Sequence, residues 1–292
     1  MNTAQANVDT PGRTPAPRVS RRRLPWGKWG LRAAAISYLG FMIVLPLSAI
    51  LENGFKDGLT VFWSDITTPV AFSALKLTLT MAVIVTAINA VMGTLTAYVL
   101  VRYRFYGRRL LNGIIDMPFA IPTLVTGVML VALYGTQRTL GAWLNSQGIK
   151  VIFATPGIVL ALLVVTYPFV IRTVQPVLME AEQGQEEAAY TIGASKWITF
   201  RRVVLPAITP AIITGSLLTF ARSLGEFGSI AVVAGNIPMK TLTASYYVYQ
   251  QIESQNQRGA SSMSILLLAL SFTLILLVEW MQGRSRRGHV AS

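Results

Sequence analysis

The stretch EAAYTIGASKWITFRRVVLP, Glu187–Pro206, lies between two long apolar segments and is the most informative part of the chain. Acidic residues crowd its start and basic residues its end, a distribution that suits the dipoles of short helices. Ala188 and Ala189 have helical spacing, and Gly193 can adopt the left-handed conformation that ends a helix. Pro206 can begin the next helix, where its missing N–H costs nothing. We therefore expect a short helix and a turn.

Outward from this stretch, the chain is organised by apolar segments. A helix needs about 20 apolar residues to cross the hydrocarbon core of a bilayer. Six segments qualify, so the expected fold class is all-α, a polytopic membrane protein with six transmembrane helices. Pro118 and Pro122 within the third segment are expected to bend it or to free carbonyls toward a cavity. The six expected spans are Ala33–Leu51, Leu77–Val101, Met117–Tyr134, Gly157–Pro176, Ala207–Gly235 and Ser262–Val278.

Composition supports a membrane protein and excludes several kinds of chemistry. Of 292 residues, 53% are hydrophobic and 13% are charged, whereas a soluble domain carries about 25% charged residues. The chain has no Cys, and its one His, His289, lies near the C-terminus. Disulfides, thiolate nucleophiles, Cys-ligated zinc and Ser-His-Asp triads are thereby excluded. We expect no catalytic residue, no metal site and no cofactor.

The formal net charge of +13 comes from basic residues that lie mostly between the expected spans or beside their ends. In membrane proteins Lys and Arg are retained in cytoplasmic loops. With six spans both termini share one side, which holds 18 basic residues against six on the other side. We therefore expect both termini in the cytoplasm, lipid around the spans and no nucleic-acid partner. The 18 are Arg13, Arg18, Arg21, Arg22, Arg23, Lys28, Arg32, Arg102, Arg104, Arg108, Arg109, Arg172, Lys196, Arg201, Arg202, Arg284, Arg286 and Arg287; the six are Lys56, Lys76, Arg138, Lys150, Lys240 and Arg258.

The opening stretch resembles the EAA loop of ABC-importer permeases, whose pattern is E-A-A, three residues, G, nine residues, an aliphatic residue, any residue and L-P. The only departure is Val203, where Ile is usual. The resemblance implies a coupling helix that docks on a cytoplasmic ATP-hydrolysing subunit and transmits its movement to the spans. An alternative without a coupling role is an interfacial helix that lies on the lipid headgroups. The ATPase-coupling residues that the resemblance implies are Glu187, Ala188, Ala189, Gly193, Leu205 and Pro206.

The fifth expected span carries two charges, Arg222 and Glu226. A charge at the bilayer centre costs about 2.5–3.5 kcal/mol on insertion scales, so it normally faces a partner or a water-filled path. Spaced i,i+4, the two can form a structural ion pair on one helix face; a role in the gate or pathway, or direct contact of Arg222 with a substrate, is compatible with that pair. The glycines here allow close helix approach or a break. The candidate pathway or gate residues are Arg222, Ser223, Gly225, Glu226, Phe227 and Gly228.

Two stretches, ARSLGEFG at 221–228 and AGNIPMKT at 234–241, resemble the sulfate and molybdate branch of these permeases, in particular the sulfate/thiosulfate permeases. The resemblance implies a type I importer bundle of the MetI-like kind in a bacterial inner membrane. It also implies three partners: a dimer of ATP-binding subunits, a second homologous permease subunit and an extracytoplasmic sulfate-binding protein. No Walker A loop is present, so this chain is expected to be no enzyme and to leave ATP hydrolysis to its partner.

The expected organisation has a disordered basic tail at 1–30, a permease domain at 31–282 and a cytoplasmic tail at 283–292. The importer core covers about 72–282, with the coupling loop at 178–206. A molybdate/tungstate permease remains an alternative, because both anions are tetrahedral dianions. An ion-coupled secondary anion transporter or a membrane enzyme would need further intramembrane carboxylates or convergent acid and base groups, and the spans offer few beyond Arg222 and Glu226.

Overall fold

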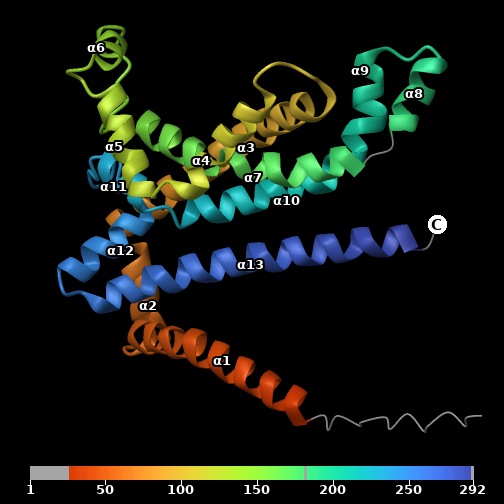
Figure 1. Cartoon of the computed structure of the whole chain (residues 1–292). Helices are drawn as coiled ribbons and strands as arrows, with labels where there is room; N and C mark the ends of the chain where they lie inside the picture. The colour runs from red at the N-terminus through yellow and green to blue at the C-terminus, as the bar shows by residue number, and fades with distance from the viewer. Residues whose placement is uncertain (1–25, 181–182, 291–292) are drawn as a thin grey trace, which may run out of the picture. The chain divides into compact units, whose positions relative to one another are not determined.

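The computed structural model describes residues 26–180 and 183–290, and all regular elements in these ranges are helical (Figure 1). The all-α class is confirmed. The chain divides into two compact units, residues 1–47 and 48–292, with the boundary inside the first helix. The elements are α1 (Trp26–Phe55), α2 (Leu59–Thr67), α3 (Pro69–Arg102), α4 (Arg108–Ala120), α5 (Thr123–Tyr134), α6 (Thr139–Ser146), α7 (Thr155–Glu180), α8 (Gln183–Thr191), α9 (Lys196–Thr199), the π-helix η1 (Phe200–Val204), α10 (Leu205–Leu224), α11 (Gly228–Val233), α12 (Ala244–Glu253) and α13 (Gln257–Val290).

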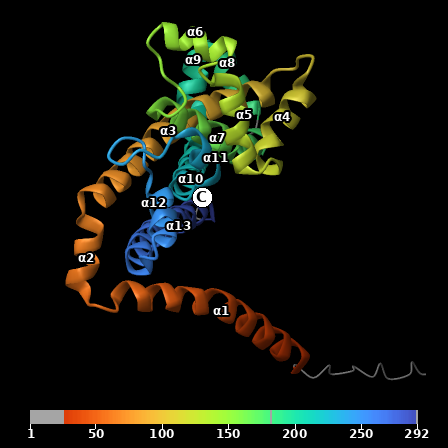
Figure 2. The same cartoon turned by 90° about the vertical axis from the view of Figure 1, so that its left-hand side faces the viewer.

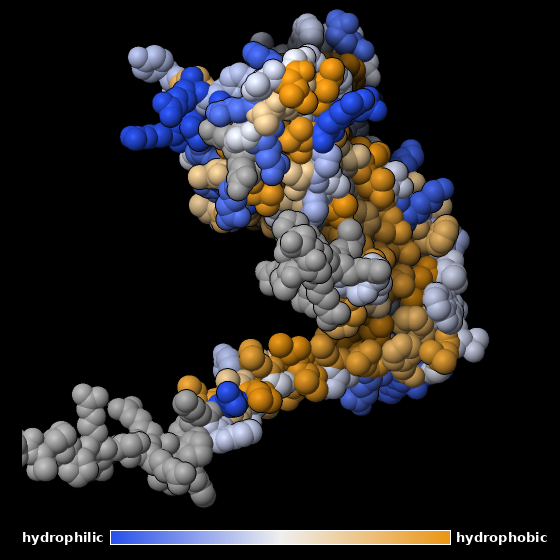
Figure 3. Space-filling model, turned by 90° about the vertical axis from the view of Figure 1, so that its right-hand side faces the viewer, coloured by the Kyte–Doolittle hydropathy of each residue, from blue (hydrophilic) through white to orange (hydrophobic). Residues whose placement is uncertain are grey.

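Five helical runs in the described residues are long and apolar enough to cross a membrane. The bent pair α4 and α5 supplies a sixth if it is counted as one span. Figure 3 shows hydrophobic side chains across much of the visible surface, with hydrophilic ones mainly in the upper part of the view and a further group near its bottom. Exposed apolar side chains in such numbers fit a lipid environment. The five runs are Trp29–Phe55, Pro69–Arg102, Thr155–Glu180, Lys196–Leu224 and Gln257–Leu277.

Helices α3, α7 and α10 form the centre of the second unit and lie side by side in both views (Figures 1 and 2). Small residues allow this close packing. A Cβ added to Gly93 of α3 would lie 2.9 Å from the Val170 Cβ of α7, and one on Gly215 of α10 would lie 2.8 Å from the Val170 Cα. The fully buried Ile171 and Ile208 fill the interface between these helices. Glycine therefore sets the interhelical distance, as is common in membranes.

The third expected span, Met117–Tyr134, is wrong as a single helix. Helix α4 ends at Ala120, α5 begins at Thr123, and the two are bent by 114°. Ile121 is extended, at φ −86° and ψ 126°, because a residue that precedes proline is disfavoured in the helical region. The bend expected at the prolines is thus observed at Pro122, whereas Pro118 stays inside α4.

The fifth expected span, Ala207–Gly235, is also wrong in its limits. Helix α10 ends at Leu224, residues 225–227 are not helical, and the short α11 follows. At the other end, Pro206 lies in the first turn of α10, as expected, although α9 and η1 precede it in one helical run that starts at Lys196. The π-helix η1 just before Pro206 widens the turn, with the Leu205 N–H bonded to the Phe200 carbonyl, which accommodates a ring that would crowd the carbonyl four residues earlier.

Parts of both expected tails are helical, so the expected disorder is wrong for residues 26–30, whereas the cytoplasmic placement of both tails stays a prediction. Residues 26–30 belong to α1, and residues 283–290 belong to α13. The remaining parts of the tail predictions, residues 1–25 and 291–292, lie outside the described residues.

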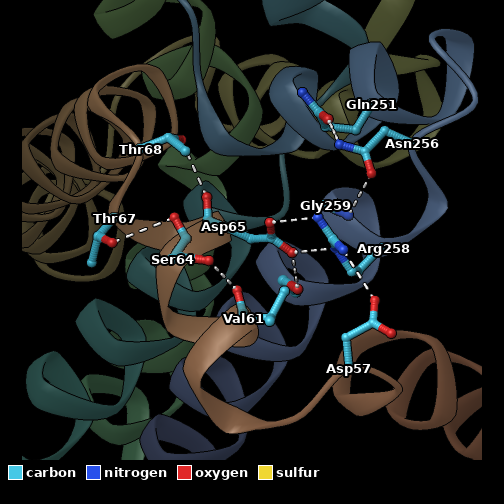
Figure 4. A network of polar contacts seen from close by, with 11 residues as sticks. Asp57, Val61, Ser64, Asp65, Thr67, Thr68, Gln251, Asn256, Arg258 and Gly259 are labelled. Atoms are coloured by element: carbon cyan, nitrogen blue, oxygen red, sulfur yellow. Dashed lines mark hydrogen bonds and ion pairs between the residues drawn. The ribbon is translucent and has the colours of Figure 1, made fainter.

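A polar cluster joins α2 to the first turn of α13 (Figure 4). The Arg258 guanidinium donates to both Asp65 carboxylate oxygens, at 3.1 Å and 3.4 Å, and to Asp57 Oδ2 at 3.0 Å. Ser262 donates to Asp65 as well, at 3.3 Å. Forked pairing of this kind fixes geometry better than a single contact, so the cluster orients α2 against α13.

Candidate functional site

The break between α10 and α11 brings the charged residues together. Gly225 caps α10 and faces open space, because a Cβ added there would have no atom within 4 Å. Glu226 and Phe227 follow in the non-helical segment. The expected ion pair is present, with Arg222 Nη1 2.7 Å from Glu226 Oε2. The expectation that both residues share one helix face is wrong, because Glu226 lies beyond the end of α10.

Glu226 is the best-anchored polar side chain of this break. It is 1% exposed, and its Oε1 accepts hydrogen bonds from the Ser229 backbone N–H at 2.9 Å and from the Ser229 hydroxyl at 2.8 Å. The carboxylate therefore caps the first turn of α11, where a negative charge is favoured. Arg222 is about one third exposed, so its guanidinium is held by Glu226 and still reaches the surrounding space.

Two breaks in the fold lie against each other at this point. A Cβ on Gly228 of α11 would clash with the Thr123 hydroxyl and lie 2.9 Å from the Leu124 backbone N, at the start of α5. A Cβ on Gly127 of α5 would in turn lie 2.8 Å from the Ser229 carbonyl. The close helix approach expected at Gly228 is therefore observed. Non-helical backbone at membrane depth occurs where it is buried in protein or lines a water-filled path.

Helix α12 completes the surroundings of the break. The Ser245 hydroxyl donates to the Glu226 carbonyl at 2.6 Å. Phe227 stacks on Tyr246 with ring centroids 5.8 Å apart and lies 5.3 Å from the Tyr249 ring. On α12, outside the candidate spans, a hydrogen bond with the Glu253 carboxylate raises the pKa of the Tyr249 phenol. Of the expected residues, Ser223 is buried and donates to a carbonyl of its own helix.

The loop 178–206 begins inside α7, which continues to Glu180, and its short helix is α8. Gly193 has φ +85°, and the Ala194 N–H donates to the Ala189 carbonyl at 3.0 Å. This is the six-to-one bond of a Schellman motif, which requires a left-handed residue. The expected helix stop at Gly193 is confirmed. Ser195 then caps the next helix by accepting from the Ile198 N–H at 3.4 Å.

The loop presents a mixed apolar and charged surface. Glu187, Ala188 and Gly193 are exposed, as is Pro206 on the adjoining helix, whereas Ala189 is buried and Leu205 half-buried. Ile192 is 86% exposed and Trp197 is 68% exposed. Large apolar side chains at these fractions mark an interaction surface or a membrane contact. The exposed residues of this surface are Glu187, Ala188, Tyr190, Ile192, Gly193, Trp197 and Ile198.

The structure adds residues that sequence reasoning missed. Ser229 stands three positions after Glu226, and this capping spacing was a usable signal. Ser245 and the α12 tyrosines carry no local signal, because only the tertiary fold brings them to the break. Asn89, a polar residue in the middle of α3, is 3% exposed and donates to the Thr166 hydroxyl at 2.9 Å.

Several apolar helical spans, two helix breaks in contact and a helical loop with an exposed apolar face define a multi-pass transport protein. The chain belongs to the family of binding-protein-dependent transport system inner membrane components, whose model matches residues 89–288. It is 39% identical over 268 residues to the sulfate transport system permease protein CysT of Escherichia coli K12, a match that covers 92% of this chain and 96% of the relative. It is 42% identical over 269 residues to the probable sulfate transport system permease protein cysT of Nephroselmis olivacea, covering 92% and 93%.

Solved structures with the same fold are ABC importers. A bacterial ABC transporter that imports the acidic polysaccharide alginate matches with a TM-score of 0.75 at 17% identity, over 89% of this chain and 96% of that chain. The MetNI methionine ABC transporter in an inward-facing conformation matches with a TM-score of 0.59 at 20% identity, over 73% and 94%. At these identities the likeness establishes the fold, which is that of MetI-like importer permeases. The family membership makes the protein a transporter component.

Proposed function

We propose that this chain is the membrane-spanning permease subunit of an ATP-driven sulfate/thiosulfate importer. The observation that carries the substrate is the extent of the similarity. Relatives named as sulfate transport system permeases share 39% and 42% identity with it across more than 90% of both chains. Sulfate and thiosulfate are stable oxyanions that cross unchanged, so the transporter needs no acid or base chemistry of its own.

The coupling surface is assigned to α8 and the turn that follows it. Its features suit a protein partner: Ile192 and Trp197 are exposed apolar side chains, and Glu187 and Ala188 stand exposed beside them. Aromatic and aliphatic side chains of this kind anchor interfaces by filling pockets on the partner. We assign the partner as a cytoplasmic ATP-binding subunit, whose dimerisation around ATP moves α8.

The translocation pathway is assigned to the paired breaks. Arg222 supplies a cation that is about one third exposed, and Glu226 holds it from a buried position. A dianion that passes this point gains a charge-assisted contact, while the carboxylate opposes strong retention. Passage requires binding that is favourable enough to admit an ion and weak enough to release it, and an arginine already engaged by a carboxylate meets both conditions.

The assembly needs more than one copy of this fold. One chain carries one α8, whereas a dimer of ATP-binding subunits offers two docking clefts. We assign the second position to a homologous permease subunit that forms a pseudo-symmetric pair with this one. An extracytoplasmic sulfate-binding protein delivers the anion, and both termini lie in the cytoplasm, in agreement with the distribution of Lys and Arg.

The experiment is uptake of labelled sulfate into proteoliposomes that contain the whole complex. ATP-dependent uptake that thiosulfate inhibits more strongly than molybdate supports the proposal, and preferential molybdate transport supports the alternative of a molybdate/tungstate permease. Uptake that persists without the ATP-binding subunit identifies a secondary transporter instead. Gly193→Pro and Glu187→Lys are expected to lower ATPase association and uptake while membrane insertion persists; normal uptake in both variants contradicts the coupling assignment.

A further inference from the structure

We propose that the ion pair between Arg102 and Glu186 is a mechanical link that carries the movement of α8 into α3. Arg102 is the last residue of α3, and Glu186 lies in the first turn of α8, 84 positions later in the chain. The proposal rests on the proposed function, in which a partner subunit moves α8. Neither residue belongs to the EAA pattern, and Arg102 lies on a different spanning helix.

The geometry of the pair is unusual for two charges at the end of a helix. Arg102 Nη2 lies 2.5 Å from Glu186 Oε1, and the side chains are only 10% and 12% exposed. Exposed ion pairs are weak because water screens them, but a pair removed from water holds its two ends together more strongly, and removal of one partner leaves a buried charge. Displacement of Glu186 therefore pulls on Arg102.

A single N–H···O contact makes the link. The Arg102 Nε atom is buried and has no hydrogen-bond partner among the described residues. A bidentate Arg–carboxylate fork would hold the two groups in one relative orientation. A single contact fixes the distance and leaves the angle between the elements free. The pair can therefore act as a pivot that transmits translation of α8 while α8 rotates.

The remaining contacts of α8 show why this link matters. Within the described residues, α8 packs mainly against α9 and η1, which continue directly into α10. Tyr98 of α3 meets Phe200 of η1 edge-on, with centroids 5.2 Å apart. Without the ion pair, movement of α8 would reach α10 through η1, and it would reach α3 only indirectly, through this ring contact and through the packing of α3 against α7 and α10.

Beside the ion pair lies a cavity of about 530 Å³. Tyr98, Tyr103, Tyr190 and Trp197 contribute its aromatic lining, and both members of the pair face it. Open space next to the pair gives α8 room to shift without a clash. A coupling element must switch between two packed arrangements, because a tightly packed core does not deform continuously. A cavity beside α8 leaves space for the second arrangement and therefore favours movement.

The experiment uses the complete complex in proteoliposomes, with ATP hydrolysis and sulfate uptake measured on the same vesicles. In Arg102→Met and Glu186→Gln, we expect uptake per ATP hydrolysed to fall about 2- to 30-fold, the range produced by residues on a coupling path. Arg102→Lys keeps a cation and is expected to restore most of the ratio. Arg104→Met is the matched control, because Arg104 is exposed and two positions further along.

The ratio separates a coupling role from a structural one. The link is overturned if uptake per ATP hydrolysed is unchanged in both Arg102→Met and Glu186→Gln. This includes the case in which hydrolysis and uptake fall in equal proportion, since that is the result of poor docking or folding. Glu186→Gln preserves side-chain shape and decides the matter if Arg102→Met fails to assemble. Absence of ATP-driven uptake in the unmodified complex would refute the proposed function itself, before any variant is compared.

Discussion

The buried carboxylate at the α10–α11 break gives a quantitative test of the site. Glu226 accepts two hydrogen bonds from Ser229 through Oε1 and pairs with Arg222 through Oε2. Glu226→Ala removes all three contacts. Glu226→Gln keeps an amide oxygen that can accept from Ser229, and it removes the charge and the acceptor that face Arg222. Comparison of the two variants therefore separates the capping of α11 from the ion pair.

The expected magnitudes follow from burial. Loss of the acceptor for the buried Ser229 N–H costs about 1–3 kcal/mol. The ion pair contributes less, about 1 kcal/mol, because Arg222 is one third exposed and water screens it. Glu226→Ala is thus expected to destabilise the protein by about 2–4 kcal/mol and Glu226→Gln by about 1 kcal/mol.

The assay is the temperature at which half of the detergent-solubilised complex loses its monodisperse peak. One kcal/mol corresponds to about 2–4 °C for a domain of 150–250 residues, so Glu226→Ala is expected to lower the midpoint by about 4–16 °C and Glu226→Gln by about 2–4 °C. Glu52→Ala, a change of an exposed carboxylate, is the control. Equal losses in the two Glu226 variants would refute the capping argument, and a wild-type midpoint for Glu226→Ala would refute the contacts themselves.

Two further predictions concern backbone approach and a buried hydrogen bond. Gly228→Val is expected to lower sulfate uptake at least about ten-fold, because even a Cβ would clash with the Thr123 hydroxyl and must separate α11 from α5. Gly113→Val, at an exposed position of α4 with open space around it, should stay within about two-fold of wild type. Equal uptake by both variants would contradict the packing. Asn89→Ala removes the hydrogen bond that the Thr166 hydroxyl accepts. It is expected to lower the free energy of unfolding by about 1–3 kcal/mol in the same heating assay. No change in the midpoint would show that this hydrogen bond does not stabilise the contact between α3 and α7.

Much of the fold could be predicted because hydropathy and local backbone chemistry are properties of short segments. The apolar runs identified the spanning helices α1, α3, α7 and α13 within a few residues at most ends. Gly193 identified the end of α8, since only a residue that tolerates positive φ closes that turn. These predictions required no knowledge of distant contacts.

The two helix breaks show where such reasoning stops. Pro122 indicated a bend, but its 114° angle depends on what α5 packs against. The end of α10 at Leu224 was missed because residues 225–235 remain apolar enough to continue a span. Hydropathy reports whether a segment tolerates lipid, and it does not report whether the segment is helical. The contact between Gly228 and Thr123 joins residues 105 positions apart, beyond any local pattern.

The same limit explains how Arg102 was interpreted. Counted with its neighbours, it is one of 18 basic residues expected on the cytoplasmic side, and the count takes no account of partners. In the structure its guanidinium lies in a buried pair with Glu186, whereas Arg104 is exposed. A count of Lys and Arg predicts the topology of the chain. Only burial distinguishes a basic residue that merely sets the topology from one that joins two helices.

The arrangement of breaks and continuous helices suggests how the two candidate regions communicate. One helical run, Lys196–Leu224, joins the coupling loop to the charged break, and at 1.5 Å per residue its 29 residues span about 44 Å. A continuous helix transmits displacement along its axis with little loss, so movement at Lys196 arrives at Leu224. Beyond Leu224 the chain is not helical for three residues, and there the displacement can change the spacing between Arg222 and Glu226. The break therefore lies at the end of the continuous helix, beside the ion pair to which we assign the translocation pathway.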